Sequence, residues 1–207
     1  MSENSQIETD NQQERYWDKN LGWIGYLAGI IDGEGSICIN TVQNDKYYHG
    51  RFRFMPQILI GNSNRAMLEK IVKIYKKMGI NTEVIFRSRE SKYYKKPTAM
   101  DMFMVVINNQ KDIRKVLSII TPFLVAKHKQ AVLMKKYLDG RLKETKKRIK
   151  QKNSNSVQRP YYRKIDIERV LRLKILNHPN ISSETTRQAF LEKISKSKNV
   201  EKTRMKI

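Results

Sequence analysis

The sequence predicts an α+β fold in which helices cover one face of a four-stranded antiparallel sheet. Apolar residues recur at helical spacing in some segments and alternate with polar residues in shorter ones. The resulting order is helix, two strands, helix, two strands and further helices. Turn residues at Asn44-Asp45-Lys46 separate the first two strands, and a basic loop through residues 93–96 joins the other two. We therefore expect two antiparallel hairpins with one polar face.

The first predicted helix spans residues 16–32 and follows a polar, acidic segment at 1–15, which we expect to be disordered. Gly33 and Gly35 end the helix, because glycine allows the chain to turn there. The strands are predicted at 36–41, 51–60, 83–88 and 101–108.

The second strand has the clearest alternation. One face carries Phe52, Phe54, Ile58 and Ile60, and the other carries Arg51, Arg53 and Gln57. Pro56 interrupts this pattern. Since proline has no N–H to donate, we expect a bulge or a missing ladder bond at that position.

The later helices are predicted at 67–78, 113–120, 125–138, 165–176 and 185–194. Asn62-Ser63-Asn64 indicates a cap before the first of these, Gly79 ends it, and Pro122 ends the next. We therefore expect a core domain at 16–140 and a C-terminal helical extension at 165–207. Between them, residues 141–164 hold ten basic residues and one acidic residue, which predicts a basic linker or an arm lying on a polyanion.

The composition also indicates a polyanionic partner. The 207 residues include 42 Lys and Arg against 20 Asp and Glu, a net charge of +22, which favours DNA or RNA. A membrane surface is disfavoured, since neither a long apolar run nor a basic amphipathic helix with an aromatic face is present.

Cysteine usage and the N-terminal composition bear on the compartment. Cys38 is the only cysteine, so neither an intramolecular disulfide nor a cysteine-rich zinc site is expected. The acidic first eighteen residues resemble neither a signal peptide nor a transit peptide. We expect an intracellular protein, placed in a chloroplast or mitochondrion if encoded there and otherwise in a prokaryotic cytoplasm.

The segment from Leu27 to Gly35 carries the most specific chemical pattern. Small residues at Gly25, Ala28 and Gly29 would let a second copy of the helix approach closely. The helix ends in two carboxylates, Asp32 and Glu34. Magnesium prefers oxygen ligands and usually takes one or two protein carboxylates, so two copies of this helix would complete a metal site that one copy cannot.

This segment resembles the LAGLIDADG motif of homing endonucleases, as L-A-G-x-I-D-x-x-G with conservative variants at Ile30 and Glu34. Thr121-Pro122-Phe123-Leu124 followed by Lys127-His128-Lys129-Gln130-Ala131 is similar to a second segment of the single-motif members. The resemblance implies the αββαββα fold, whose sheet forms a DNA-binding saddle. Because the chain has one motif copy, it also implies a homodimer.

The resemblance further implies roles for single residues. Glu34 would bind Mg²⁺ beside the scissile phosphates, with Mn²⁺ or Ca²⁺ as possible substitutes and the Gly33 carbonyl as the neighbouring ligand. Lys127 would assist the water or stabilise charge. The dimer interface would contain Gly25, Ala28, Gly29 and Asp32, and Asp32 would also cap the helix end.

DNA contacts are expected on the polar sheet face, because a two-stranded ribbon fits the major groove, and along the basic segments. The predicted contact residues are Asn40, Asn44, Arg51, Arg53, Gln57, Arg65, Arg87, Arg89, Lys129, Lys146, Lys147 and Arg148. The chain departs from the family pattern at 60–65, where members carry water-organising polar residues. Ile60, Gly61 and Asn64 stand there, and only Arg65 aligns as a basic residue.

These features predict a homodimeric, metal-dependent DNA endonuclease that cuts a long, near-palindromic site and is encoded within an intron. One alternative is an RNA maturase that assists splicing of its host intron, with or without DNA cleavage. Another is a DNA-binding regulator with an inactive site, which the presence of Glu34 and Lys127 disfavours.

Overall fold

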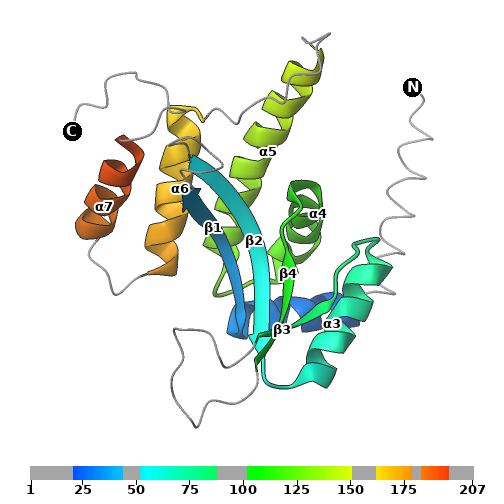
Figure 1. Cartoon of the computed structure of the whole chain (residues 1–207). Coiled ribbons are helices and arrows are strands. Elements are labelled where there is room, and N and C mark those ends of the chain that lie inside the picture. Colours follow the sequence, from blue (N-terminus) through cyan, green and yellow to red (C-terminus); the bar gives the residue numbers. More distant parts are fainter. Residues whose placement is uncertain (1–20, 44–51, 88–101, 151–161, 179–182, 196–207) are drawn as a thin grey trace.

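The computed structural model describes residues 21–43, 52–87, 102–150, 162–178 and 183–195 (Figure 1). A helix at 21–33, here the motif helix, leads into the strands β1 (Gly35–Gln43) and β2 (Phe52–Asn62). The remaining elements are α3 (Arg65–Lys77), β3 (Val84–Arg87), β4 (Met102–Ile107), α4 (Gln110–Ile120), the short 3-10 helix η1 (Thr121–Phe123), α5 (His128–Lys150), α6 (Lys164–Asn177) and α7 (Ser183–Ser195). The predicted α+β fold is confirmed.

The strands form one antiparallel sheet in the order β1-β2-β4-β3. The predicted bulge at Pro56 is wrong, because the register of β1 and β2 passes without interruption through the Ile39–Pro56 pair. β4 joins β2 only from Ile58 onward. Beside Pro56, none of the other described strands pairs with β2 on the side opposite β1, and proline is tolerated in a sheet at such an edge.

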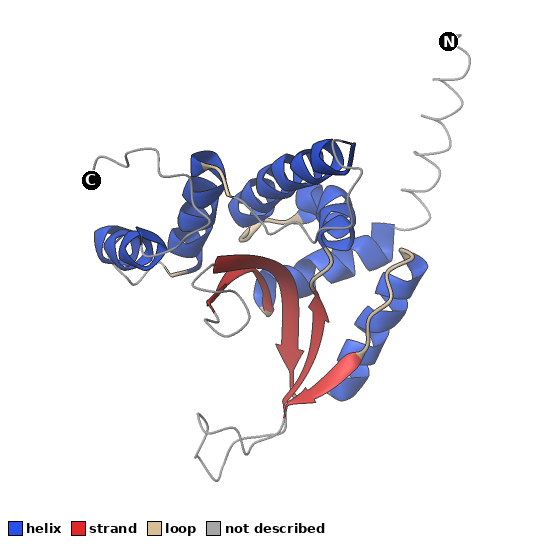
Figure 2. Cartoon of the chain, turned by 45° about the horizontal axis from the view of Figure 1, so that its top comes forward, coloured by secondary structure: helices blue, strands red, loops and turns tan. Residues whose placement is uncertain are grey.

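The alternation in the strands places one set of side chains against the helices. Ile37, Ile39, Phe54, Ile58 and Ile60 are buried in a core shared with the motif helix and α3 to α7. α3 contacts β2, β3 and β4, α4 contacts β2, and both α5 and α6 contact β1. Figure 2 shows the helices gathered on one side of the curved sheet, which leaves its other face uncovered by them.

The predicted ends of α3 are confirmed. The Asn64 side chain accepts a hydrogen bond from the Met67 amide at 3.1 Å, as expected of an N-cap. Gly79 follows the helix with φ +69°, a conformation that glycine adopts without strain. None of the helices in the described ranges combines the length and apolar composition that a membrane span requires.

The basic segment after residue 140 differs from the prediction. α5 was expected to end at Leu138 and give way to a linker, but it continues to Lys150. Lys and Arg are good helix formers, and Arg141 is buried, so this part of the segment belongs to the fold. Residues 151–161 lie outside the described residues. The C-terminal helices α6 and α7 share the main core through residues including Val170 and Phe190.

Candidate functional site

The motif helix has one buried and one open face. Ile24, Leu27 and Ile31 are fully buried, whereas Gly22, Gly25 and Gly29 are exposed together with Leu21 and Tyr26. A Cβ atom built on any of these three glycines would meet nothing within 4 Å. The stripe formed by the three glycines therefore exposes backbone, which is a surface that another helix can approach closely.

The prediction that Ala28 belongs to this open face is wrong. Ala28 is 1% exposed and packs in the core of its own chain, because it is offset from Gly29 by about 100° around the helix. Gly22 takes its place on the open face, at helical spacing from Gly25 and Gly29.

Asp32 fastens the end of the motif helix to the start of α5. Its carboxylate accepts hydrogen bonds from the main-chain amides of Val125 (2.6 Å), Ala126 (3.2 Å) and Lys127 (2.9 Å). These donors lie just before α5. Amides at the start of a helix have no acceptor within that helix, so they need one from elsewhere. Asp32 was predicted to cap the end of its own helix, but its carboxylate accepts from the amides that lead into α5 instead.

Lys127 lies at the same point. Its Nζ donates to the main-chain oxygen of Asp32, and its backbone is held by the Asp32 carboxylate. The two segments that carried the family resemblance, which lie far apart in the sequence, therefore meet at the end of the motif helix. The catalytic role of Lys127 stays a prediction.

Glu34 occupies the turn between the motif helix and β1. Its amide still donates to the Ile30 carbonyl at 2.8 Å, and its side chain is exposed. The next residue must be glycine, because a Cβ on Gly35 would lie 2.7 Å from the Ile31 Cα. The Glu34 carboxylate consequently stands at a helix C-terminus, whose partial negative charge attracts cations.

Asn62 was not predicted as a site residue, yet it contacts Glu34 directly. Its Nδ2 donates to the Glu34 Oε2, and its Oδ1 accepts from the Asn64 amide at 2.7 Å. The hairpin register contained a signal for this contact, since Gly35 pairs with Ile60 and Asn62 lies two residues further along β2. This polar residue lies within the 60–65 segment in which few polar groups were expected to support the site.

The uncovered sheet face carries three of the predicted DNA contacts. Asn40, Arg53 and Gln57 are exposed or half-buried there, and the Asn40 Nδ2 donates to the Gln57 Oε1 at 2.9 Å. The face is less polar than predicted, because partly or fully exposed apolar side chains share it (Met55, Leu59, Ile85, Met102 and Met104). Burial raises the pKa of Cys38 on the same face and disfavours its thiolate.

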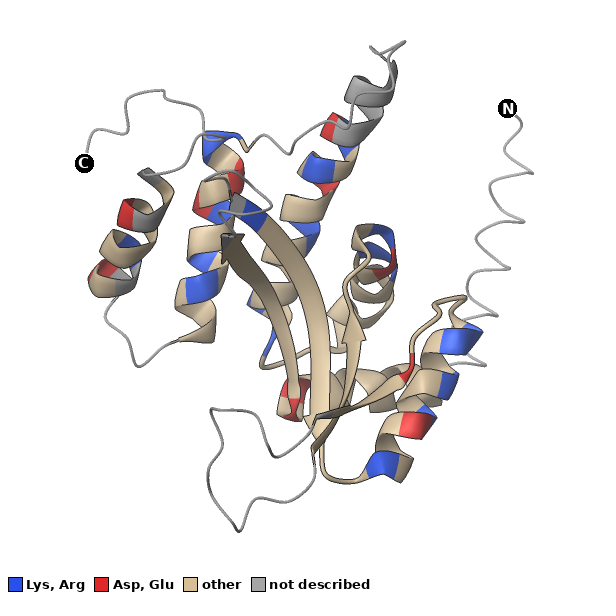
Figure 3. Cartoon of the chain, in the orientation of Figure 1, with Lys and Arg blue, Asp and Glu red and all other residues tan. Residues whose placement is uncertain are grey.

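The other predicted contacts are more scattered. Arg65 is exposed, pairs with Glu69 at 2.9 Å and lies over the Phe103 ring, while Lys129 is exposed in the first turn of α5. Figure 3 shows Lys and Arg distributed over the helices α3 to α6, with acidic residues at the end of the motif helix. Asn44, Arg51 and Arg89 lie outside the described residues, and so do the side chains of Arg87, Lys146, Lys147 and Arg148.

Substitutions of the two acidic residues of the motif should lower the free energy of unfolding by different amounts. Asp32→Ala removes the acceptor of three amides and is expected to lower the free energy of unfolding by about 2 kcal/mol, measured by urea denaturation. Glu34→Ala, at an exposed turn, is expected to change it by less than about 0.5 kcal/mol. Equal losses in the two variants would contradict the division into a capping acid and an exposed acid.

Comparison with known proteins supports the fold. No protein-family model matches the sequence, and no curated protein matches it significantly. The archaeal intron-encoded homing endonuclease I-Vdi141I, solved in complex with DNA, superimposes with a TM-score of 0.52 at 16% identity, covering 82% of this chain and 95% of that one.

Two further solved structures are similar at lower scores. The homing endonuclease I-CvuI, solved with DNA, has a TM-score of 0.49 at 17% identity, over 86% of this chain and 98% of that one. The LAGLIDADG homing endonuclease I-SmaMI, bound to cleaved DNA, has a TM-score of 0.49 at 20% identity, over 82% and 48%. From the similarity to I-Vdi141I, together with the sheet order and the motif at the helix end, the chain has the LAGLIDADG homing-endonuclease fold.

Proposed function

We propose that the chain is a site-specific DNA endonuclease that hydrolyses phosphodiester bonds with a divalent metal and acts as a homodimer. The observation that carries this proposal is the meeting of Glu34, Asn62 and Lys127 at the end of the motif helix. A carboxylate and an amide that orients it thereby lie two residues from the Asp32 carbonyl, which the amine of Lys127 contacts from a distant segment.

The oxygen donors at this point suit Mg²⁺. The Glu34 carboxylate and the Gly33 main-chain carbonyl would hold the ion, and Mn²⁺ or Ca²⁺ share the preference for such ligands. In the described ranges no three His, Cys, Asp or Glu side chains cluster, so Glu34 of a second copy would supply the other carboxylate. A bound metal polarises the phosphate and lowers the pKa of an attacking water.

The surrounding residues each have a physical task. Asn62 fixes the orientation of the Glu34 carboxylate through its amide, and is itself fixed by the Asn64 amide. The ammonium of Lys127 would offset the negative charge that develops on the phosphate in the transition state. Asp32 contributes by holding the Lys127 backbone in place.

A second copy of the chain is the partner that fits the open helix face. A closed twofold contact uses the same surface of each copy, and Gly22, Gly25 and Gly29 would let the two helix backbones approach closely. Such a contact brings two Glu34 carboxylates near the axis. The DNA site would then share the twofold symmetry and be near-palindromic.

The uncovered sheet face is the surface proposed to read DNA. A strand ribbon fits the major groove, where arginine pairs with guanine and glutamine with adenine, and Arg53 and Gln57 stand on that face. The net charge of +22 predicts binding that weakens steeply with salt. The similarity to an intron-encoded enzyme supports extending the proposal to a gene within an intron.

The function is tested by selecting binding sites from random-sequence duplex DNA with the purified chain in Ca²⁺. The selected duplex is then incubated with Mg²⁺ or with a chelator. We expect a bound complex at low salt and cutting of both strands only when Mg²⁺ is present. Cutting that persists in the chelator would overturn the metal-dependent mechanism, and failure to enrich any duplex would overturn DNA recognition.

A further inference from the structure

Among the strands that the structure describes, only β1 flanks the outer half of β2, before Ile58. β1 pairs with β2 along its length from Phe52 to Ile60, whereas β4 pairs with it only from Ile58 to Asn62. A strand in an antiparallel sheet directs its amides alternately to its two sides. On the side that β4 does not reach, a buried amide needs another acceptor, because a buried unpaired N–H is costly.

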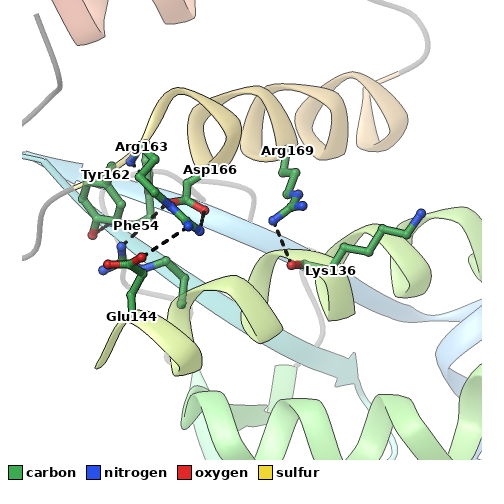
Figure 4. Close-up of polar contacts among 8 residues, drawn as sticks. Phe54, Lys136, Glu144, Tyr162, Arg163, Asp166 and Arg169 are labelled. Atoms are coloured by element: carbon green, nitrogen blue, oxygen red, sulfur yellow. Dashed lines mark hydrogen bonds and ion pairs between the residues drawn. The ribbon is translucent and has the colours of Figure 1, made fainter. Parts of the chain in front are cut away.

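Tyr162 supplies that acceptor from a position 108 residues away in the chain. Its hydroxyl accepts a buried hydrogen bond from the Phe54 amide at 2.9 Å, as Figure 4 shows. The side chain is 2% exposed, and its ring lies 4.4 Å from the Phe54 ring, centroid to centroid. Burial raises the pKa of Tyr162, so the hydroxyl stays neutral in this position.

An ion-pair cluster between α5 and α6 holds Tyr162 in place (Figure 4). The Arg141 guanidinium lies 4.7 Å from the centre of the Tyr162 ring and pairs with Asp166 at 3.8 Å. Asp166 is fully buried and accepts from the backbone amide and the guanidinium of Arg163 at 3.2 Å. Arg163 also reaches Glu144 at 3.3 Å. A fully buried carboxylate with this many donors has little freedom to move.

The helices α5 and α6 pack closely against each other. A Cβ on Gly140 would lie 2.9 Å from the Arg163 Nη2, and the Arg169 Nη1 donates to the Lys136 carbonyl at 3.0 Å. At the other end of α6, the Asn177 Nδ2 donates to the Ile37 carbonyl of β1 at 2.9 Å. The C-terminal segment therefore forms hydrogen bonds with both strands of the β1–β2 ribbon.

The anchored half of the ribbon lies away from Glu34. Phe54 pairs with Thr41, which follows Glu34 by seven residues. At roughly 3.3 Å per strand residue, Thr41 therefore lies about 23 Å along the strand from Glu34. That distance corresponds to about seven base pairs of B-DNA. Arg53, next to Phe54, is exposed on the uncovered face, so this half of the ribbon would face base pairs well outside the cut.

We propose that Tyr162 is a positioning residue that fixes the outer half of the β1–β2 ribbon, so that the C-terminal helices control base discrimination in the outer part of each half-site. This inference rests on the proposed function, because it requires the sheet to read DNA. It assigns the extension after α5 a role in specificity that is separate from the chemistry at Glu34.

The test uses Tyr162→Phe in the full chain, which keeps the ring and removes the acceptor. Tyr75→Phe is the matched control, because the Tyr75 hydroxyl is buried and has no hydrogen-bond partner among the described residues. Without DNA, hydrogen exchange of the Phe54 amide is compared with that of Ile58. We expect the Tyr162 variant to lose roughly tenfold protection at Phe54 relative to Ile58, and the control to lose none.

The second arm measures binding to the selected duplex with single mismatches along each half-site. In Tyr162→Phe, discrimination should fall roughly five- to tenfold at about six to eight base pairs from the cut, while central positions and the cutting rate of the matched duplex stay as in wild type. If discrimination falls equally at all positions, or does not change, the inference is overturned while the proposed function stands. A wild-type chain that selects no duplex would overturn the proposed function and this inference with it, whatever the exchange result.

Discussion

Glu34→Gln is expected to bind the selected duplex normally and to cut it roughly 1000-fold more slowly or not at all. Glutamine retains an oxygen that can accept from the Asn62 amide, so the turn before β1 should keep its shape. It removes the negative charge that a divalent metal requires. Cutting is measured in Mg²⁺ under single-turnover conditions, and binding is measured in Ca²⁺.

Glu69→Gln is the matched control, because Glu69 is also an exposed glutamate and its pair with Arg65 lies on α3. Surface pairs of this kind contribute little to stability, so both binding and cutting should resemble wild type. If Glu34→Gln cuts as fast as this control, Glu34 is not the metal ligand.

Gly29→Leu is expected to weaken self-association by roughly tenfold to more than 100-fold, since a bulky side chain would keep the two helix backbones apart. Within one chain the new side chain has room, because a Cβ on Gly29 meets nothing within 4 Å. Replacing a helical glycine also favours the helix, so the free energy of unfolding of the monomer should not fall. Sedimentation equilibrium measures the dimer, and cutting should decline in parallel.

Lys76→Leu provides the control for an added leucine on a helix surface, since Lys76 is exposed in the last turn of α3. This variant should associate and cut as wild type does. If Gly29→Leu remains as dimeric as the control, the open face of the motif helix is not the dimer contact.

Much of the fold could be predicted because the controlling signals are local. The alternation of Phe54, Ile58 and Ile60 fixed the inner face of β2, and Asn64 and Gly79 marked the ends of α3. The position of Glu34 at the end of the motif helix followed from the glycines around it. Each of these features depends on neighbours in the chain and on the period of a strand or a helix.

The errors arose where tertiary contacts or long side chains decide the outcome. Ala28 was grouped with nearby small residues, but the orientation of the helix on the sheet buries it. The basic run that begins at Arg141 was interpreted as a linker because of its charge, although its first part is helical and Arg141 lies over the Tyr162 ring. Charge alone does not separate a linker from a helix with one exposed face.

The contacts of Asn62 and Tyr162 required the assembled structure. Asn62 reaches Glu34 only because β1 and β2 pair in one particular register. Tyr162 reaches Phe54 only because α6 docks on α5 and against β1. Hydrogen bonds between such distant segments leave no periodic pattern in the sequence from which they could be inferred.

Mapping the cut positions on both strands of the selected duplex tests the central claim most directly, namely that two copies of the motif helix build one metal-dependent site. With Mg²⁺, we predict one cut in each strand, at positions related by the twofold axis of the near-palindromic sequence, and none when a chelator is present. Cuts that have no twofold relation, or that appear without a divalent metal, would contradict it.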